Sequence, residues 1–202
     1  MKKLFVYCTL ITCIIGCSHK KKMKPVEYVH WIEDTDHYLH QVKQLGDIEL
    51  DVQYRPADYI LCKSGELEDV VSPDLLDSLR QKYDSLFFVS ITLKGINGGD
   101  PLVGVAGPEQ IEAVLYYFQF QFQKDIFLSL EKSGQKLSPV LFHFERFYTV
   151  NNAKTFLVGF DKNVKTLDQD VQLIIDSEYL PSGQVNFTFD KEELSDQPVV
   201  EL

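Results

Sequence analysis

Several side chains in the N-terminal part of the chain have the types and spacing that metal binding needs. His30, Asp34, His37 and His40 fall within eleven residues. If this segment were helical, His30, Asp34 and His37 would share one face, and His40 would follow one turn later. Imidazole and carboxylate groups at such spacing can hold zinc, but the His-Glu-x-x-His pair of zinc proteases is absent. The alternative is a polar surface segment that docks through Trp31, so we predict no bound metal.

A second group could support acid–base chemistry. On a strand through Leu141–Phe147, His143 and Glu145 point to one face, whereas Arg146 lies among phenylalanines on the other. A paired histidine and glutamate can exchange protons with a substrate. Such a pair is also common on a solvent-facing strand, and no Gly-x-Ser-x-Gly nucleophile turn occurs in the chain. We therefore keep these three residues as hydrolase candidates and predict no catalytic site.

A glycine-rich segment from Gly95 to Pro108 could cradle a phosphate. It lacks the Gly-Lys-Ser/Thr ending of a P-loop and the Gly-x-Gly-x-x-Gly spacing of dinucleotide sites. We interpret it as a surface loop that uses glycine for positive φ angles, and we predict no cofactor.

The most reactive position is Cys17. The basic start Met1–Lys3 precedes the apolar run Leu4–Ile15, and Gly16 then gives a small residue before the cysteine. Twelve residues are too few to span a bilayer, which takes about 20. An ordinary secretory signal with an incidental cysteine is the alternative. The arrangement resembles the lipobox of bacterial lipoproteins, which implies cleavage before Cys17 and addition of acyl chains such as palmitate to its sulfur and new amino group.

Charge limits the classes of partner. The net charge is −10, and removal of residues 1–17 takes away two lysines and no acid. Four of the remaining lysines lie between Lys20 and Lys24, so the body is strongly acidic. Nucleic-acid binding needs a basic face, and we exclude it. The lysines could touch anionic headgroups or form a solvated spacer.

Cysteine usage indicates how the body is stabilised. With Cys8, Cys13 and Cys17 in or next to the signal, only Cys62 remains, so no internal disulfide is expected. Cys62 ends the apolar run Tyr59–Cys62 and is predicted to be a buried, inert thiol rather than a nucleophile.

We divide the chain into a signal peptide (1–17), a basic tether (18–27), a globular body (28–190) and an acidic, frayed tail (191–202). Strand patterns are followed by other strand patterns more often than by helices, which predicts an α+β fold on a mainly antiparallel sheet. Ser72 and Pro73 begin one expected helix, and Pro108 begins another that runs to about Gln121. Seven or eight strands are expected, in the ranges 48–54, 86–93, 125–130, 137–148, 155–160, 171–175 and 184–189.

The lipobox occurs together with the segments Gln53–Tyr59, Phe142–Arg146 and Leu157–Phe160. This combination resembles a family of uncharacterised predicted lipoproteins from Bacteroidota-type bacteria. The resemblance implies a lineage and no activity. Surface-exported lipoproteins of such bacteria carry acidic residues after the lipidated cysteine, whereas Ser18, His19 and three lysines follow here. This difference favours a membrane-anchored protein that faces the periplasm.

Three functions follow from these features. The first is a lipid-anchored envelope lipoprotein whose body is a non-enzymatic binding or assembly module for an envelope protein. The second is a carrier that holds a lipid or glycan in an aromatic-lined cavity, because phenylalanine and tyrosine are abundant. The third is a hydrolase that uses His143 and Glu145.

Overall fold

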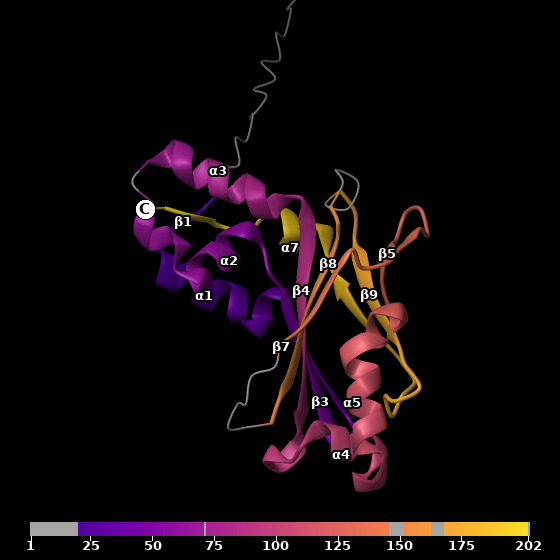
Figure 1. Ribbon diagram of the computed structural model, residues 1–202. Coiled ribbons are helices and arrows are strands. Elements are labelled where there is room, and N and C mark those ends of the chain that lie inside the picture. Colours follow the sequence, from indigo (N-terminus) through magenta and orange to yellow (C-terminus); the bar gives the residue numbers. More distant parts are fainter. Residues whose placement is uncertain (1–19, 71, 146–151, 163–167, 202) are drawn as a thin grey trace, which may run out of the picture.

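The computed structural model describes residues 20–70, 72–145, 152–162 and 168–201 (Figure 1). A five-stranded antiparallel sheet is ordered β2 (His40–Leu45), β3 (Ile48–Tyr54), β4 (Leu86–Gly95), β8 (Lys154–Asp161) and β7 (Leu141–Glu145). A four-stranded antiparallel sheet is ordered β10 (Gln184–Phe189), β9 (Val171–Asp176), β5 (Ile126–Leu130) and β6 (Lys136–Leu137). A short parallel pair joins β1 (Lys22–Met23) to β11 (Val199–Val200).

The helices lie on different sides of the five-stranded sheet. Helices α1 (Pro25–Glu33), α2 (Ala57–Ser64) and α3 (Pro73–Asp84) stand together against the upper part of one face, and the four-stranded sheet lies on the other side (Figure 1). Helices α4 (Pro101–Ala106) and α5 (Ile111–Phe120) lie at the end far from β1, and the short α7 (Lys191–Ser195) precedes β11. No helix within the described ranges is long and apolar enough to span a membrane.

Alternation along β3 sets which face of the sheet is buried. Ile48, Leu50 and Val52 are completely buried, whereas Glu49 and Asp51 between them point to the opposite face. The inner faces of the two sheets therefore meet in a hydrophobic core, and the outer face of the five-stranded sheet is polar.

Aromatic side chains fill much of this core. The ring centroids of Phe118 and Phe122 are 4.9 Å apart, and that of Phe156 lies 5.0 Å from Phe122. All three side chains are fully buried. At the other end of the core, Tyr54 stacks on Phe87 with a centroid distance of 4.5 Å. In these clusters the aromatic rings pack against one another.

The expected class, α and β elements on antiparallel sheets, is confirmed, but its details need correction. The described residues form eleven strands and six α-helices, more than the eight strands and two helices expected. The glycine-rich segment contains α4, which Asp100 caps by accepting a hydrogen bond from the Leu102 amide. Residues 137–148 are not one strand: β6 and β7 belong to different sheets, and Ser138, Pro139 and Val140 separate them.

Both ends of the body are more ordered than expected. The tether was expected to extend to residue 27, but Lys22 and Met23 already form β1 and α1 begins at Pro25. The predicted fraying of 191–202 is wrong for residues 191–201, which contain α7 and β11. Despite its acidic composition, this segment contains two apolar side chains that are buried against the body, Leu194 and Val200.

Candidate functional site

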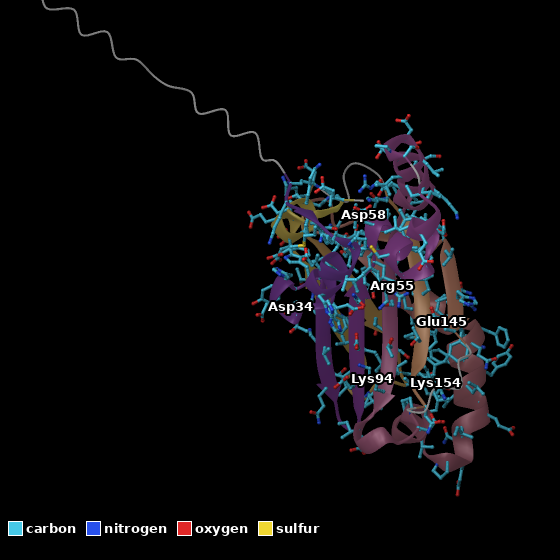
Figure 2. The ribbon with its side chains drawn as sticks, turned by 90° about the vertical axis from the view of Figure 1, so that its left-hand side faces the viewer. Asp34, Arg55, Asp58, Lys94, Glu145 and Lys154 are labelled. Carbon is cyan, nitrogen blue, oxygen red and sulfur yellow. The ribbon has the colours of Figure 1, made fainter. Side chains whose placement is uncertain are left out.

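The outer face of the five-stranded sheet carries polar side chains from all five strands. Helices α1–α3 cover its upper part, and Figure 2 looks onto it, with Arg55 beneath the helices and Lys94 and Glu145 lower on the sheet. The strand register places one side chain in two on this face. Its central members are His40, Asp51, Gln53, Ser90, Thr92, Lys94, Thr155, Leu157, His143 and Glu145.

A charged network crosses the β2 side of this face. His40 Nε2 lies 2.9 Å from Asp51 Oδ1, and His40 Nδ1 lies 2.7 Å from the carbonyl oxygen of Glu33. Both oxygens are acceptors, so both ring nitrogens must carry protons to satisfy them. The hydrogen bond to Asp51 accordingly raises the pKa of His40, which favours the imidazolium form.

Lys94 completes the network from the neighbouring strand. Its ammonium group binds Asp51 and, at 3.1 Å, Glu49. Burial alone would raise the pKa of Asp51, but the hydrogen bonds from His40 and Lys94 outweigh burial and lower it. Two cations therefore share two carboxylates, and the network is close to electrically neutral.

A cleft of about 260 Å³ lies where α2 and α3 meet this sheet face. Its lining includes Tyr59, Tyr83, Phe88 and Leu157, together with Arg55, which lies where β3 leads into α2. The Nε atom of Arg55 is buried and has no hydrogen-bond partner among the described residues. The cleft therefore combines apolar walls with an arginine whose buried Nε has no hydrogen-bond partner among the described residues.

Tyr59 links this cleft to the neighbouring polar groups. Its hydroxyl donates to Glu33 Oε1 at 2.8 Å, and Lys63 binds the same oxygen at 3.0 Å. The hydroxyl also lies 3.5 Å from the amide oxygen of Gln53, which is only 8% exposed and whose amide nitrogen has no hydrogen-bond partner in the described part of the chain. Burial and then the Glu33 hydrogen bond raise the pKa of Tyr59, so the phenol stays protonated and acts as a donor.

A second cleft, also of about 260 Å³, lies at the β1–β11 end of the body. Asp58 and Arg80 form its charged wall, and both also bind the backbone of Val200. Lys162 pairs with Asp84 at 3.0 Å beside them. Asp58 lies 2.6 Å from Arg80, so all four of these charged side chains have an opposite charge within 3.0 Å. The Asp58–Arg80 pair of this cleft thus holds the backbone of β11, and the other two charges neutralise each other.

The hydrolase candidates lie on an edge strand. His143 is exposed on β7 and pairs across the sheet with Leu157, one of the cleft walls, while Glu145 pairs with Thr155. Within the described part of the chain, no hydrogen bond or ion pair joins His143 or Glu145 to another side chain. Arg146 lies outside the described residues. Among the described residues, His143 and Glu145 thus do not form an acid–base pair with each other.

The four metal candidates are not brought together. Helix α1 ends at Glu33, so His30 lies in its last turn while Asp34 caps a following 3₁₀ turn. His37 instead stacks on Trp31, with a centroid distance of 4.0 Å, and His40 faces Asp51. The helix needed to align these residues stops too early. Among the described residues, no group of three or more potential ligands could hold a metal ion.

The two remaining cysteine predictions have different outcomes. Cys62 lies on α2 and is half-buried rather than fully buried, and burial raises its pKa to about 11. An uncharged thiol is the expected state at neutral pH, as for an inert cysteine. Cys17 lies outside the described residues, so its lipidation stays a prediction.

Sequence reasoning missed Arg55, Asp58 and Arg80 as site residues. Asp58 carries one usable signal: it lies three positions before Leu61, in the helical register of a buried face. An acid at such a position needs a buried cation, and only three arginines are present in the chain. Nothing in the local sequence of Arg55 distinguishes it from a surface arginine.

Comparisons with known proteins add little. No protein-family model and no curated protein matches the chain. Among solved structures, it is similar to a DUF4426 family protein from Pseudomonas aeruginosa PAO1, at 10% identity and a TM-score of 0.34. That match covers 75% of this chain and 92% of the other.

Proposed function

We propose that this chain is a lipid-anchored lipoprotein of the bacterial cell envelope, facing the periplasm, whose acidic body is a non-enzymatic binding or assembly module. The sequence from Ile14 to Cys17 supports the anchor, and Lys20–Lys22 and Lys24 follow it directly.

One observation supports this proposal most strongly: the segment that follows Cys17 is built into the body. Lys22 and Met23 pair with Val199 and Val200, and Met23 is buried. Only residues 18–21 separate Cys17 from this strand, and an extended chain covers about 18 Å over that interval. A lipid on Cys17 would therefore hold the body close to the bilayer surface.

The pairing also gives the anchor a firm attachment. Val200 is bound through its amide to Asp58 and through its carbonyl to Arg80, so β1 and β11 are joined to α2 and α3. In Figure 1 this end of the body is opposite to α4. The outer sheet face extends along the body between the two ends and would be presented sideways to a partner in the envelope.

The first experiment tests the anchor. We expect the exported wild-type protein to carry diacylglyceryl and acyl groups by intact-mass analysis and to sediment with membranes. Cys17→Ser should lose both properties, whereas Cys13→Ser, a matched thiol removal inside the signal, should keep them. An unmodified Cys17 thiol in the wild type, or a membrane-bound Cys17→Ser protein, would refute the proposal.

The second experiment tests the binding surface. A photocrosslinking amino acid placed at Val42 or His143, on the outer sheet face, should yield the same protein adduct in repeated preparations of intact cells. The matched control is Tyr116, which is 57% exposed on α5 and should yield no adduct of that mass. Equal labelling from all three positions would argue against a binding role for this face.

A further inference from the structure

The cleft at Arg55 has the chemistry of a small-ligand site. We propose that it binds a small organic oxyanion, a carboxylate or phosphate monoester attached to a compact apolar group. This inference does not depend on lipidation of Cys17 or on a protein partner. It rests on the state of Arg55, on the cleft walls and on the volume.

The two described arginines differ in their partners. Arg80 is satisfied by Asp58 at 2.6 and 2.9 Å, by Asp77 at 3.2 Å and by the carbonyl of Val200. Among the described residues, Arg55 makes no side-chain hydrogen bond and no ion pair, although acids outnumber bases by 30 to 20 in the chain. Its guanidinium carbon lies 6.0 Å from the centroid of the Tyr59 ring.

An unpaired guanidinium that lines a cleft favours an anion. Each guanidinium nitrogen is a donor and none is an acceptor, so only a group rich in acceptors can satisfy Arg55. The Gln53 amide can rotate to present either its oxygen or its nitrogen, so it fits a donor or an acceptor on the ligand. The need for acceptor groups on the ligand therefore comes from Arg55 alone. Carboxylates and phosphates fit the planar donor pair with two parallel hydrogen bonds.

The surrounding charges do not cancel this preference. Glu33, which accepts a hydrogen bond from the Tyr59 hydroxyl of this cleft, is also bound by Lys63. Lys63 also lies 5.7 Å from the centroid of the Tyr59 ring and lines the cleft. Glu33 and Lys63 neutralise each other, which leaves the charge of Arg55 for a ligand.

The walls and the volume define the rest of the ligand. Phe88 of β4 and Leu157 of β8 form the floor, and Tyr59 and Tyr83 rise from α2 and α3. Flat aromatic and aliphatic groups suit such walls. A volume of about 260 Å³ is below the usual range for drug-sized ligands, which begins at about 300 Å³. A phenyl ring or short alkyl chain beside the anion is therefore the expected size.

The test is calorimetric titration of the full-length protein in a non-ionic detergent. The probes are phenyl phosphate and phenylacetate, with benzyl alcohol and inorganic phosphate as controls that lack either the charge or the ring. We expect saturable binding of at least one probe to one site, and weaker binding of both controls. Arg55→Met should weaken probe binding by about tenfold to a hundredfold, and Arg55→Lys by less, because charge is kept while the paired donors are lost.

Two further variants control for folding. Lys136→Met removes a cation that lies 5.6 Å from the Phe127 ring on the other sheet, and it should bind like the wild type. Ser64→Trp fills the cleft from the exposed end of α2 without touching Arg55 and should abolish binding even if Arg55→Met does not fold. The proposal is overturned if neither probe saturates, or if Ser64→Trp and Arg55→Met bind as well as Lys136→Met. Lipidation and membrane attachment would be unaffected by either result.

Discussion

Asp58 and Arg80 face each other through two parallel hydrogen bonds, from Nε to Oδ1 at 2.6 Å and from Nη2 to Oδ2 at 2.9 Å. The same pair holds Val200, whose amide donates to Asp58 at 2.9 Å and whose carbonyl accepts from Arg80 at 3.0 Å. One ion pair thereby satisfies both backbone groups of a residue near the C-terminal end. It explains why a segment of acidic composition is ordered.

Replacement of Asp58 by Asn should be strongly destabilising. The substitution leaves the Arg80 charge without its carboxylate in a largely buried setting, where Asp58 is 9% exposed. We expect the free energy of unfolding to fall by about 2–4 kcal/mol, somewhat less than for a fully buried pair because Arg80 is partly exposed. Urea unfolding followed by circular dichroism measures the change.

Asp77→Asn is the matched control for that experiment. Asp77 also binds Arg80, at 3.2 Å, but is 67% exposed. Its removal should cost about 0.5 kcal/mol or less, as for other exposed ion pairs. A similar loss from both variants would mean that burial and the Val200 contacts do not set the strength of the Asp58 pair.

The contrast between β3 and the contacts of Asp58 with Arg80 and Val200 shows what the sequence could predict. The alternation from Ile48 to Tyr54 specifies a half-buried strand locally, and the structure confirms it. In contrast, Asp58 binds Arg80, 22 residues away in the sequence, and Val200, 142 residues away. No local pattern encodes such a meeting, because it exists only after α2, α3 and β11 have packed. The Arg55 cleft was missed for the same reason.

Short elements were also harder to predict than long ones. The helix that begins at Ser72 and Pro73 was expected from its cap, and Ser72 does accept a hydrogen bond from the Leu75 amide. In contrast, α4 and β11 are six and two residues long. Neither has room for a hydrophobic period, so tertiary contacts must specify them.

Gly95 should not tolerate a side chain. A Cβ atom at this position would lie 2.1 Å from the carbonyl oxygen of Gly99, and both groups are backbone. Gly95→Ala must therefore displace the loop between β4 and α4, at an expected cost of about 1–3 kcal/mol. Thermal unfolding would measure this loss of stability.

Gly99→Ala is the control, since its Cβ would meet only one atom, at 3.8 Å, and its φ of −67° suits alanine. Equal stability of the two variants would contradict the close approach.

The His40 network should make stability depend on pH. The hydrogen bond to Asp51 raises the pKa of His40 in the folded protein above its ordinary value of about 6.5. A raised folded pKa gives stability that is fully present below the unfolded pKa and is lost as pH rises through the folded pKa. The free energy of unfolding of the wild type should thus exceed that of His40→Gln most at pH 5.5, with a smaller difference at pH 9.

Exposed His30 provides the control for this pH dependence. His30→Gln removes an imidazole from the neighbouring helix and should shift stability little across the same range. A difference between wild type and His40→Gln that stays constant from pH 5.5 to pH 9 would show that the charge of His40 does not stabilise the fold.

Cys62 should react slowly in the folded protein. Burial, with a smaller contribution from the nearby charge of Asp58, raises the pKa of its thiol to about 11. Since the thiolate is the reactive form and an ordinary cysteine has a pKa of about 8.5, the folded protein should contain about a hundredfold less thiolate at pH 8. Iodoacetamide labelling, read by mass spectrometry and assigned with Cys62→Ala, should speed up by at least about tenfold on addition of urea. In the folded state, the rate should rise steadily with pH up to about pH 11. Labelling at pH 8 that is as fast before urea as after it would show a low-pKa, accessible thiol and would restore Cys62 as a candidate nucleophile.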